Sequence, residues 1–252
     1  MKKLFARFVA ALRFLTIIPV PGKIGHGSAE LAGSMLFFPF IGLCIGCCAA
    51  AVSWLLWLVF PPSVAAVLLT LVLLGFSGGL HLDGLADTAD GFFSARPREK
   101  ILAIMRDSRI GAMGVIALVL ILVLKISALA SLDRAEAFKA ALLMPVAGRC
   151  AILILMALLP YARPEGGLGT LFYTRRSRLT GIWAFLFFCL LAWLLAGSGF
   201  GLPVLFPGIT VIAFAWFCKK MIGGATGDTL GAACELSEAC TALACSALAW
   251  SA

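Results

Sequence analysis

Charged residues are scarce in this chain, which has only 12 acidic and 20 basic residues among 252 and is 62% hydrophobic. A soluble domain of this length could not bury so much apolar side chain. The chain also lacks the ten-residue alternation of apolar and polar residues that marks a membrane β-barrel. Its apolar runs are instead close to 20 residues long, which is the length an α-helix needs to cross about 30 Å of hydrocarbon. The sequence therefore predicts an all-α, polytopic transmembrane helix bundle, with residues 1–252 forming one integral membrane catalytic domain.

Two further absences exclude other classes of partner. The net charge of +8 is not accompanied by the spaced aromatic and basic residues of a nucleic-acid surface, so we expect no nucleic-acid partner. Basic residues in loops fit the cytoplasmic side of a membrane and its anionic headgroups better. Cys44 and Cys47 form a C-x-x-C motif, but no second pair or nearby histidine completes a zinc site. We interpret the nine cysteines as small packing residues.

The apolar runs predict six to seven spans, the last of them short in apolar residues. The expected ranges are about 34–60, 63–82, 113–132, 137–161, 180–196, 202–218 and 228–250. The second span is expected to run straight into the acidic stretch that follows it. Residues 1–16 have a broad apolar stripe and a basic remainder, which predicts an interfacial helix, and a second short amphipathic helix is expected after Pro97.

Basic residues alternate between the expected loops. Four segments are basic: the N-terminal arm, the loop after the second span, the loop after the fourth span, which contains Arg175 and Arg176, and the stretch after the sixth span. The other connectors are nearly neutral. By the positive-inside rule, we expect the N-terminus, both polar, glycine-rich stretches and the loop with Arg175 and Arg176 to lie in the cytoplasm. The sequence is compatible with a homo-oligomer and does not fix the oligomeric state.

The strongest chemical signal is a set of three aspartates, Asp83, Asp87 and Asp90, that directly follows an apolar run. Their i, i+4, i+7 spacing places them within about 60° on one face of a helix. Three carboxylates on one face repel one another unless a cation lies between them, and hard oxygen ligands favour Mg²⁺ or Mn²⁺. The alternative is a solvated helix end, but acids at membrane depth are functional candidates by default.

Asp107 and Arg109 lie in the same expected cytoplasmic loop. Asp107 is a candidate fourth carboxylate for a metal pair, and Arg109 is a candidate phosphate contact. A surface ion pair is the competing interpretation.

A second glycine-rich stretch contains Gly227 and Asp228, with Glu235 and Glu238 farther along one helix face. Glycines let a ligand approach the backbone, and free N–H groups at a helix start suit an anion. Close helix packing through glycine is the alternative.

Two isolated residues have open roles. His81 is a candidate general base or a hydrogen-bonded structural residue. Arg149 should face the bundle interior, where a carboxylate and a phosphate are equally good partners. Together with the acids and glycines, these arginines predict a metal-assisted transfer of a phosphate-linked group, because metal and arginine stabilise charge on the leaving oxygens.

Four segments of this sequence resemble the cobalamin synthase family, the adenosylcobinamide-GDP ribazoletransferases of bacterial inner membranes. They are FLTIIPVP (14–21), GLHLDGLADTADG (79–91), IMRDSRIGA (104–112) and GATGDTLGA (224–232). The resemblance implies that α-ribazole, or its 5′-phosphate, attacks the corrinoid-side phosphate of adenosylcobinamide-GDP and that GMP leaves, which completes the nucleotide loop of a cobamide. The implied cofactor is Mg²⁺, and membrane lipid surrounds the protein.

Carried over by position, the resemblance implies roles for individual residues. Asp83, Asp87 and Asp90 look like metal ligands, and Asp107 looks like a further metal ligand or a substrate contact. Asp83, Asp87, Asp107 and His81 form the candidate catalytic set. The candidate substrate contacts are Arg106, Arg109, Arg149, Gly227, Asp228 and Glu235. Which carboxylate takes the ribazole hydroxyl proton stays open.

Three other classes are weighed against this one. A CDP-alcohol phosphotransferase would have an arginine shortly after Asp83 and Gly84, which is missing here. A polyprenyl-diphosphate transferase would have a second D-x-x-x-D motif, and none follows the one at Asp83 and Asp87. A cation transporter would place acids near the membrane midplane and show an internal repeat, whereas these acids lie at the end of a span and the halves differ.

Overall fold

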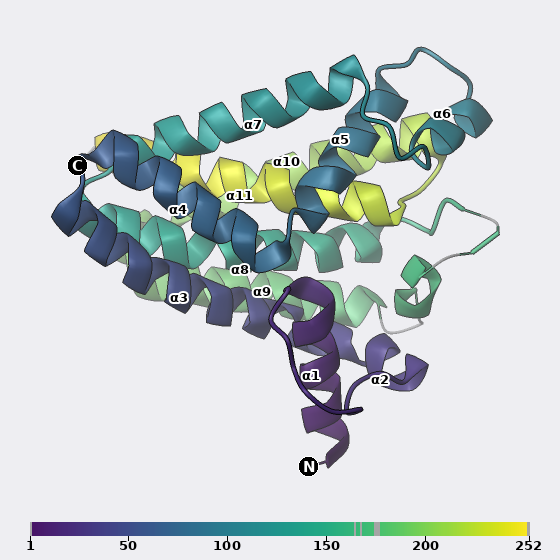
Figure 1. Ribbon diagram of the computed structural model, residues 1–252, viewed down its shortest axis with the longest axis horizontal. Coiled ribbons are helices and arrows are strands. Elements are labelled where there is room, and N and C mark those ends of the chain that lie inside the picture. Colours follow the sequence, from purple (N-terminus) through teal and green to yellow (C-terminus); the bar gives the residue numbers. More distant parts are fainter. Residues whose placement is uncertain (1, 164, 167, 174–176, 251–252) are drawn as a thin grey trace.

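The computed structural model describes residues 2–163, 165–166, 168–173 and 177–250, and these ranges form helices joined by loops (Figure 1). Arg175 and Arg176 lie outside the described residues. The elements, in chain order, are α1 (Lys2–Leu15), α2 (Ser28–Ala32), η1 (Ser34–Phe37), α3 (Phe38–Val59), α4 (Pro62–Ser77), α5 (Leu80–Phe92), α6 (Arg98–Ile104), α7 (Ala112–Ala130), α8 (Arg134–Leu158), η2 (Leu168–Phe172), α9 (Ser177–Ala196), η3 (Gly197–Phe200), α10 (Gly201–Ile222) and α11 (Gly227–Trp250).

The described chain has five helical stretches that are long and apolar enough to cross a membrane, and the bent pair of α4 and α5 makes a sixth. One of the five, Arg178–Ile222, contains both α9 and α10 in 45 residues. Its start and its end lie at the same end of the bundle, because Gly181 near the start of α9 packs against Ala157 at the end of α8, and Ala225, just after α10, donates a hydrogen bond to Pro160, just after α8. This stretch therefore crosses the bundle and returns. The predicted all-α polytopic bundle is confirmed.

Helix α8 lies at the centre of the bundle and packs against α3, α9 and α11. In the most apolar part of α8, 83% is buried inside the bundle, compared with 22% in the stretch of α9 and α10 at the periphery. Two glycines on α3 make the closest approach: a Cβ on Gly42 or Gly46 would collide with the backbone of α8 at Pro145 or Leu142. Small residues at such crossings let helices pack by close van der Waals contact, which drives association in lipid.

Helix α1 crosses the long axis of the bundle at a steep angle (Figure 1). Its side chains at Val9, Ala10 and Ala11 are buried, whereas Leu4 and Phe5 are more than half exposed. An apolar surface left open beside a membrane bundle is typical of a helix that lies in the interface. The predicted helix at residues 1–16 and the short helix after Pro97, observed as α6, are both confirmed.

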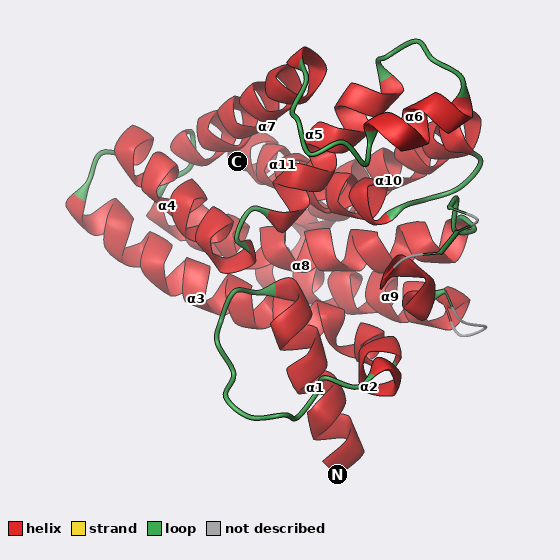
Figure 2. Cartoon of the chain, turned by 45° about the vertical axis from the view of Figure 1, so that its right-hand side comes forward, coloured by secondary structure: helices red, strands yellow, loops and turns green. Residues whose placement is uncertain are grey.

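The junction between α4 and α5 differs from its prediction. The second span does not run straight into the acidic stretch: α4 ends at Ser77, and α5 leaves it at an angle of 91°. Gly78 and Gly79 have φ angles of +60° and +78°, a left-handed region that residues with a Cβ rarely enter. Figure 2 shows α5 turned away from α4 at this junction. The two glycines therefore end the apolar helix and reorient the acidic one.

The acidic helix α5, the short helix α6 and the start of α11 lie at the same end of the bundle, opposite the C-terminus (Figure 1). We call this end the site end. Arg98 on α6 joins the loop after α8 to the end of α10 there. Segments from four parts of the sequence are thus brought together around α5.

Candidate active site

All three predicted aspartates lie on α5, and the fold adds a fourth acid to them. The charges of Asp83, Asp90 and Asp228 act on Asp87, and that of Arg163 opposes them. Asp228 comes from the first turn of α11, almost 140 residues farther along the chain. Acids from two distant glycine-rich stretches therefore share one electrostatic environment, which favours a cation at this position.

Asp83 and Asp87 line a cavity of about 390 Å³ that we call the acidic cavity. Its wall also includes Gly78 and Gly79 at the bend, and Ser108 and Ile110 from the loop before α7; the remaining residues are Leu80, Ala86 and Leu118. The loop that contains the motif at 104–112 thus reaches the aspartates of the motif at 79–91. Carboxylates and a hydroxyl facing one open cavity provide oxygen atoms of the kind that Mg²⁺ binds.

A second cavity, of about 210 Å³, also has Asp83 in its wall. We call it the aromatic cavity, because Phe14, Phe38 and Phe172 form part of its wall. The other lining residues are Leu80, His81, Asp83, Gly84, Ile152, Met156, Gly169, Gly227, Asp228, Leu230 and Gly231. Leu80 and Asp83 line both cavities, and Asp83 is the ionisable residue that they share.

Glycines let α5 and α11 approach closely beside the aromatic cavity. A Cβ on Gly84 would lie 2.7 Å from the carbonyl oxygen of Asp228, and one on Gly231 would lie 3.2 Å from the backbone of His81. Contacts under 3.0 Å are closer than real Cβ atoms allow, so no larger residue fits at Gly84 without movement. The predicted close approach to the backbone is thus used here by a second helix.

Asp228 is held in place by the loop that follows α8. Arg163 donates a hydrogen bond to the Asp228 carboxylate at 2.6 Å, and the Thr226 hydroxyl donates another at 3.2 Å. Backbone hydrogen bonds pair this loop with the segment before α11: Ala162 donates to Ala225, and Ala225 donates to Pro160. This pairing fixes Arg163 beside the acids.

Asp90 has structural partners at the start of α7. Its two carboxylate oxygens accept hydrogen bonds from the backbone N–H groups of Gly111, at 2.6 Å, and Gly114, at 2.8 Å. The start of a helix has N–H donors without internal partners and a positive dipole end, both of which suit a carboxylate. Asp90 therefore joins α7 to α5. Its assignment as a metal ligand stays a prediction.

The predicted site residues in the motif at 104–112 form exposed ion pairs. Asp107 accepts two hydrogen bonds from the Arg109 guanidinium, at 3.0 and 2.7 Å, and these bonds lower the pKa of Asp107 to about 2. Arg106 pairs with Glu165 at 2.8 Å, with both side chains about half exposed or more. Exposed pairs contribute little stability, so each arginine can exchange its partner for a phosphate group.

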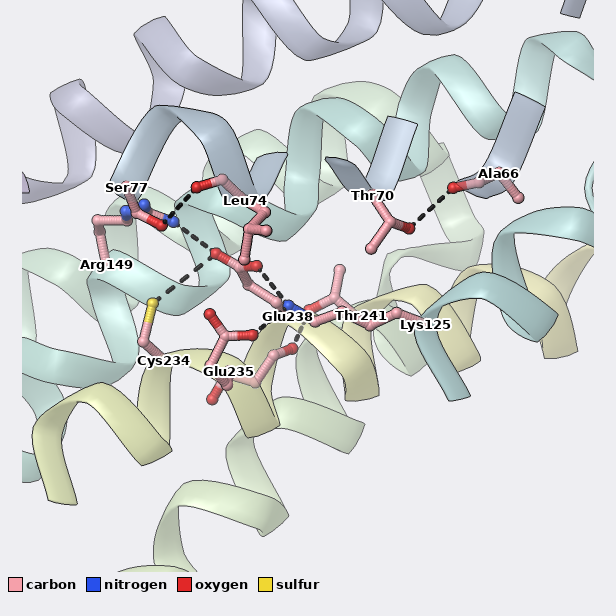
Figure 3. Close-up of polar contacts among 11 residues, drawn as sticks. Ala66, Thr70, Leu74, Ser77, Lys125, Arg149, Cys234, Glu235, Glu238 and Thr241 are labelled. Atoms are coloured by element: carbon pink, nitrogen blue, oxygen red, sulfur yellow. Dashed lines mark hydrogen bonds and ion pairs between the residues drawn. The ribbon is translucent and has the colours of Figure 1, made fainter. Parts of the chain in front are cut away.

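Arg149 and Glu235, the other predicted substrate contacts, are buried inside the bundle (Figure 3). Lys125 donates to Glu235 at 2.6 Å and to Glu238 at 2.8 Å, and Arg149 donates to the second Glu238 oxygen. Two cations and two carboxylates from α7, α8 and α11 thus form a neutral cluster, which we call the buried ion cluster. A role of Arg149 or Glu235 in substrate binding stays a prediction.

His81 is 4% exposed, lines the aromatic cavity and has no hydrogen-bond partner for its Nε2 atom among the described residues. Gly227 lines the same cavity. A buried nitrogen without a partner is costly, so it suits a position where a ligand completes the hydrogen bond.

Among the described residues, no three His, Cys, Asp or Glu side chains are grouped closely enough to hold a metal ion by themselves. Mg²⁺ does not require such a group, because it usually binds through one or two carboxylates together with water and substrate phosphates. The donor set of the acidic cavity fits that mode.

Several residues of the site have no distinct signal in the sequence. Arg163 is one basic residue of a loop there, and Phe14, Phe38 and Phe172 are apolar residues among many. Phe14 does lie in the motif at 14–21, to which the sequence assigns no chemistry. The presence of Phe14 in this unexplained motif is the one sequence signal that points to the aromatic part of the site.

Comparison with known proteins gives a consistent result. The family model for cobalamin-5-phosphate synthase matches residues 7–246. The curated relatives include an adenosylcobinamide-GDP ribazoletransferase of Desulforamulus reducens, 39% identical over 239 residues that cover 93% of this chain and 94% of the relative. A protein of the same name from Klebsiella pneumoniae is 40% identical over 237 residues, covering 92% and 95%. No solved structure matches the chain.

Proposed function

Because this chain belongs to the cobalamin-5-phosphate synthase family, we propose that it is an adenosylcobinamide-GDP ribazoletransferase. It joins adenosylcobinamide-GDP to α-ribazole, or to α-ribazole 5′-phosphate, and so completes the nucleotide loop of the cobamide. The observation that best supports this function at the level of the site is the position of Asp83, which lines both the acidic cavity and the aromatic cavity. A transfer between two substrates needs one reactive centre that both can reach.

The reaction is a displacement at phosphorus. An oxygen of a ribose hydroxyl forms a bond to the corrinoid-linked phosphorus, and the bond from that phosphorus to the bridging oxygen of GMP breaks. The hydroxyl proton passes to a base, and GMP leaves with the bonding electrons. Asp83, which lines both cavities, and Asp228, which lines the aromatic cavity, are the candidate bases for that proton.

We further propose that Asp83 and Asp87 bind Mg²⁺ together with the substrate diphosphate. When bound, the ion neutralises negative charge on the diphosphate and on the leaving phosphate. Arg106 and Arg109, whose present partners are exposed, are suited to contact phosphate oxygens near the mouth of the cavity. Arg163 holds Asp228 at 2.6 Å and limits the repulsion among the four acids.

The site end faces the cytoplasm in this proposal, and the protein lies in a bacterial inner membrane. The basic loops support this orientation, since Arg96, Arg98, Lys100, Lys219 and Lys220 all lie in or next to connections at the site end. The soluble nucleotide substrates would then reach the acids directly.

Purified protein in lipid vesicles tests the function. With adenosylcobinamide-GDP, α-ribazole and Mg²⁺, we expect release of GMP and formation of the joined cobamide in equal amounts. Release of GMP without α-ribazole would indicate hydrolysis instead. Cation flux into the vesicles without GMP release would support a transporter, and CMP release from a CDP-alcohol would support the phosphotransferase alternative.

A further inference from the structure

The aromatic cavity is not explained by metal-assisted chemistry. Three phenylalanines from three separate elements meet in it: Phe14 from α1, Phe38 from α3 and Phe172 from η2. Their ring centroids lie 5.1 Å apart for Phe14 and Phe172, 5.7 Å for Phe38 and Phe172, and 5.9 Å for Phe14 and Phe38. A wall of three mutually contacting rings beside carboxylates suits a flat aromatic ligand that also has polar groups.

The size of this cavity favours an aromatic base over a corrin ring. Its volume is about 210 Å³. For comparison, a cavity of roughly 150 Å³ takes up one benzene molecule. A fused two-ring base therefore fits, whereas a corrin macrocycle with its side chains does not.

Polar groups lie on the side of the cavity that faces α5 and α11. The buried Nε2 atom of His81 has no partner among the described residues, and the carboxylates of Asp83 and Asp228 belong to the same wall. A nucleoside has this polarity, with an aromatic base at one end and ribose hydroxyls at the other. The phenylalanines would receive the base, and the histidine and carboxylates would receive the ribose.

We propose that the aromatic cavity is the binding site for the benzimidazole base of α-ribazole. This inference rests on the proposed function and assigns the two substrates to opposite sides of Asp83. The nucleoside occupies the aromatic cavity and the diphosphate of adenosylcobinamide-GDP occupies the acidic cavity. The attacking hydroxyl and the phosphorus then meet at the carboxylate that both cavities share. The N-terminal motif thereby gains a role, because it contributes Phe14 to the base site.

Steady-state kinetics of Phe14→Leu and Phe172→Leu test this assignment. Loss of a stacking ring should raise the KM for α-ribazole by about 5- to 100-fold. The KM for adenosylcobinamide-GDP should stay within about twofold of the wild-type value, because its diphosphate binds on the other side of Asp83. Phe8→Leu is the matched control, since Phe8 lies on the same helix and packs against Phe37 outside both cavities.

Photolabelling of the wild-type protein covers the case in which the variants do not fold. An azidobenzimidazole nucleoside should label peptides that contain Phe14, Phe38 or Phe172, and α-ribazole should compete with the label. Labelling at other positions, or equal KM values for α-ribazole in all three leucine variants, would overturn the assignment. Failure of the proposed function is a separate result, because the wild-type protein would then release no GMP with both substrates present.

Discussion

The carbonyl oxygen of Asp228 occupies the space that a side chain on Gly84 would need, since a Cβ built there would lie 2.7 Å away from it. This contact places the first turn of α11 against the middle of α5. It brings the acids of two sequence motifs into one site, and both residues line the aromatic cavity. The relative position of α5 and α11 therefore depends on Gly84, a residue that has no side chain.

Gly84→Ala should reduce turnover at least tenfold, because the new methyl group forces α5 and α11 apart and displaces Asp83 from one or both cavities. GMP release by the purified variant measures this effect. Gly208→Ala is the control, since a Cβ on Gly208 of α10 would have no described atom within 4 Å. Wild-type turnover in Gly84→Ala would show that the helices adjust without moving the site.

Asp87→Asn should lower the rate of GMP release by about 100-fold or more while the protein still inserts into the membrane. The change keeps the size of the side chain and removes a negative charge from the acidic cavity. Asp133→Asn is a matched carboxylate control. Asp133 caps the start of α8 away from the site end by accepting a hydrogen bond from the Glu136 backbone at 2.8 Å. That control should retain full activity.

Removal of divalent cations tests the proposed Mg²⁺ directly. A chelator should abolish GMP release, and added Mg²⁺ should restore it, because the carboxylates of the acidic cavity repel the diphosphate when no cation is present. Binding of adenosylcobinamide-GDP should weaken in parallel, which an equilibrium binding assay can measure without turnover. Full activity after exhaustive chelation would contradict this part of the proposal.

Asp90→Ala separates a structural role from metal binding at that position. The carboxylate accepts hydrogen bonds from the backbone of Gly111 and Gly114, so its loss should lower thermal stability in detergent by about 1–2 kcal/mol. Asp87→Ala should leave stability nearly unchanged and reduce activity. If Asp90→Ala retained stability and instead weakened Mg²⁺ binding as strongly as Asp87→Ala, metal ligation would be its main role.

The sequence predicted the elements of this fold better than their directions. Hydropathy located the apolar segments, because each must supply enough apolar residues to cross a bilayer. It did not predict the 91° bend after Ser77. Gly78 and Gly79 permit both a continuous helix and the left-handed φ angles that they adopt, and hydropathy does not distinguish the two.

Parts of the site could be predicted from spacing alone. Asp83, Asp87 and Asp90 share one helix, so local periodicity was sufficient. Contacts such as that of Arg163 with Asp228 join segments 65 residues apart, and they depend on how the loop after α8 pairs with the segment before α11. No local pattern in the sequence contains that information.

The buried ion cluster gives the last prediction, because removal of any one of its four charges leaves an unbalanced charge inside the bundle. Lys125, Arg149, Glu235 and Glu238 are each 5% exposed or less. Lys125→Met alone would leave Glu235 buried without a counter-ion, at a cost of about 3–5 kcal/mol. The double variant Lys125→Met and Glu235→Gln removes one charge of each sign and leaves Arg149 paired with Glu238. It should therefore recover much of the lost stability.

Thermal unfolding in detergent, analysed as a double-mutant cycle, measures this coupling. Lys139→Gln serves as the control, since Lys139 pairs with Glu136 at a partly exposed position and its loss should cost about 1 kcal/mol or less. If the single and double variants were equally destabilised, the loss would come from packing around Lys125. Recovery in the double variant would instead assign it to charge balance. The cluster would then act as an electrostatic clamp that holds α7 and α8 against α11, whose first turn carries Asp228.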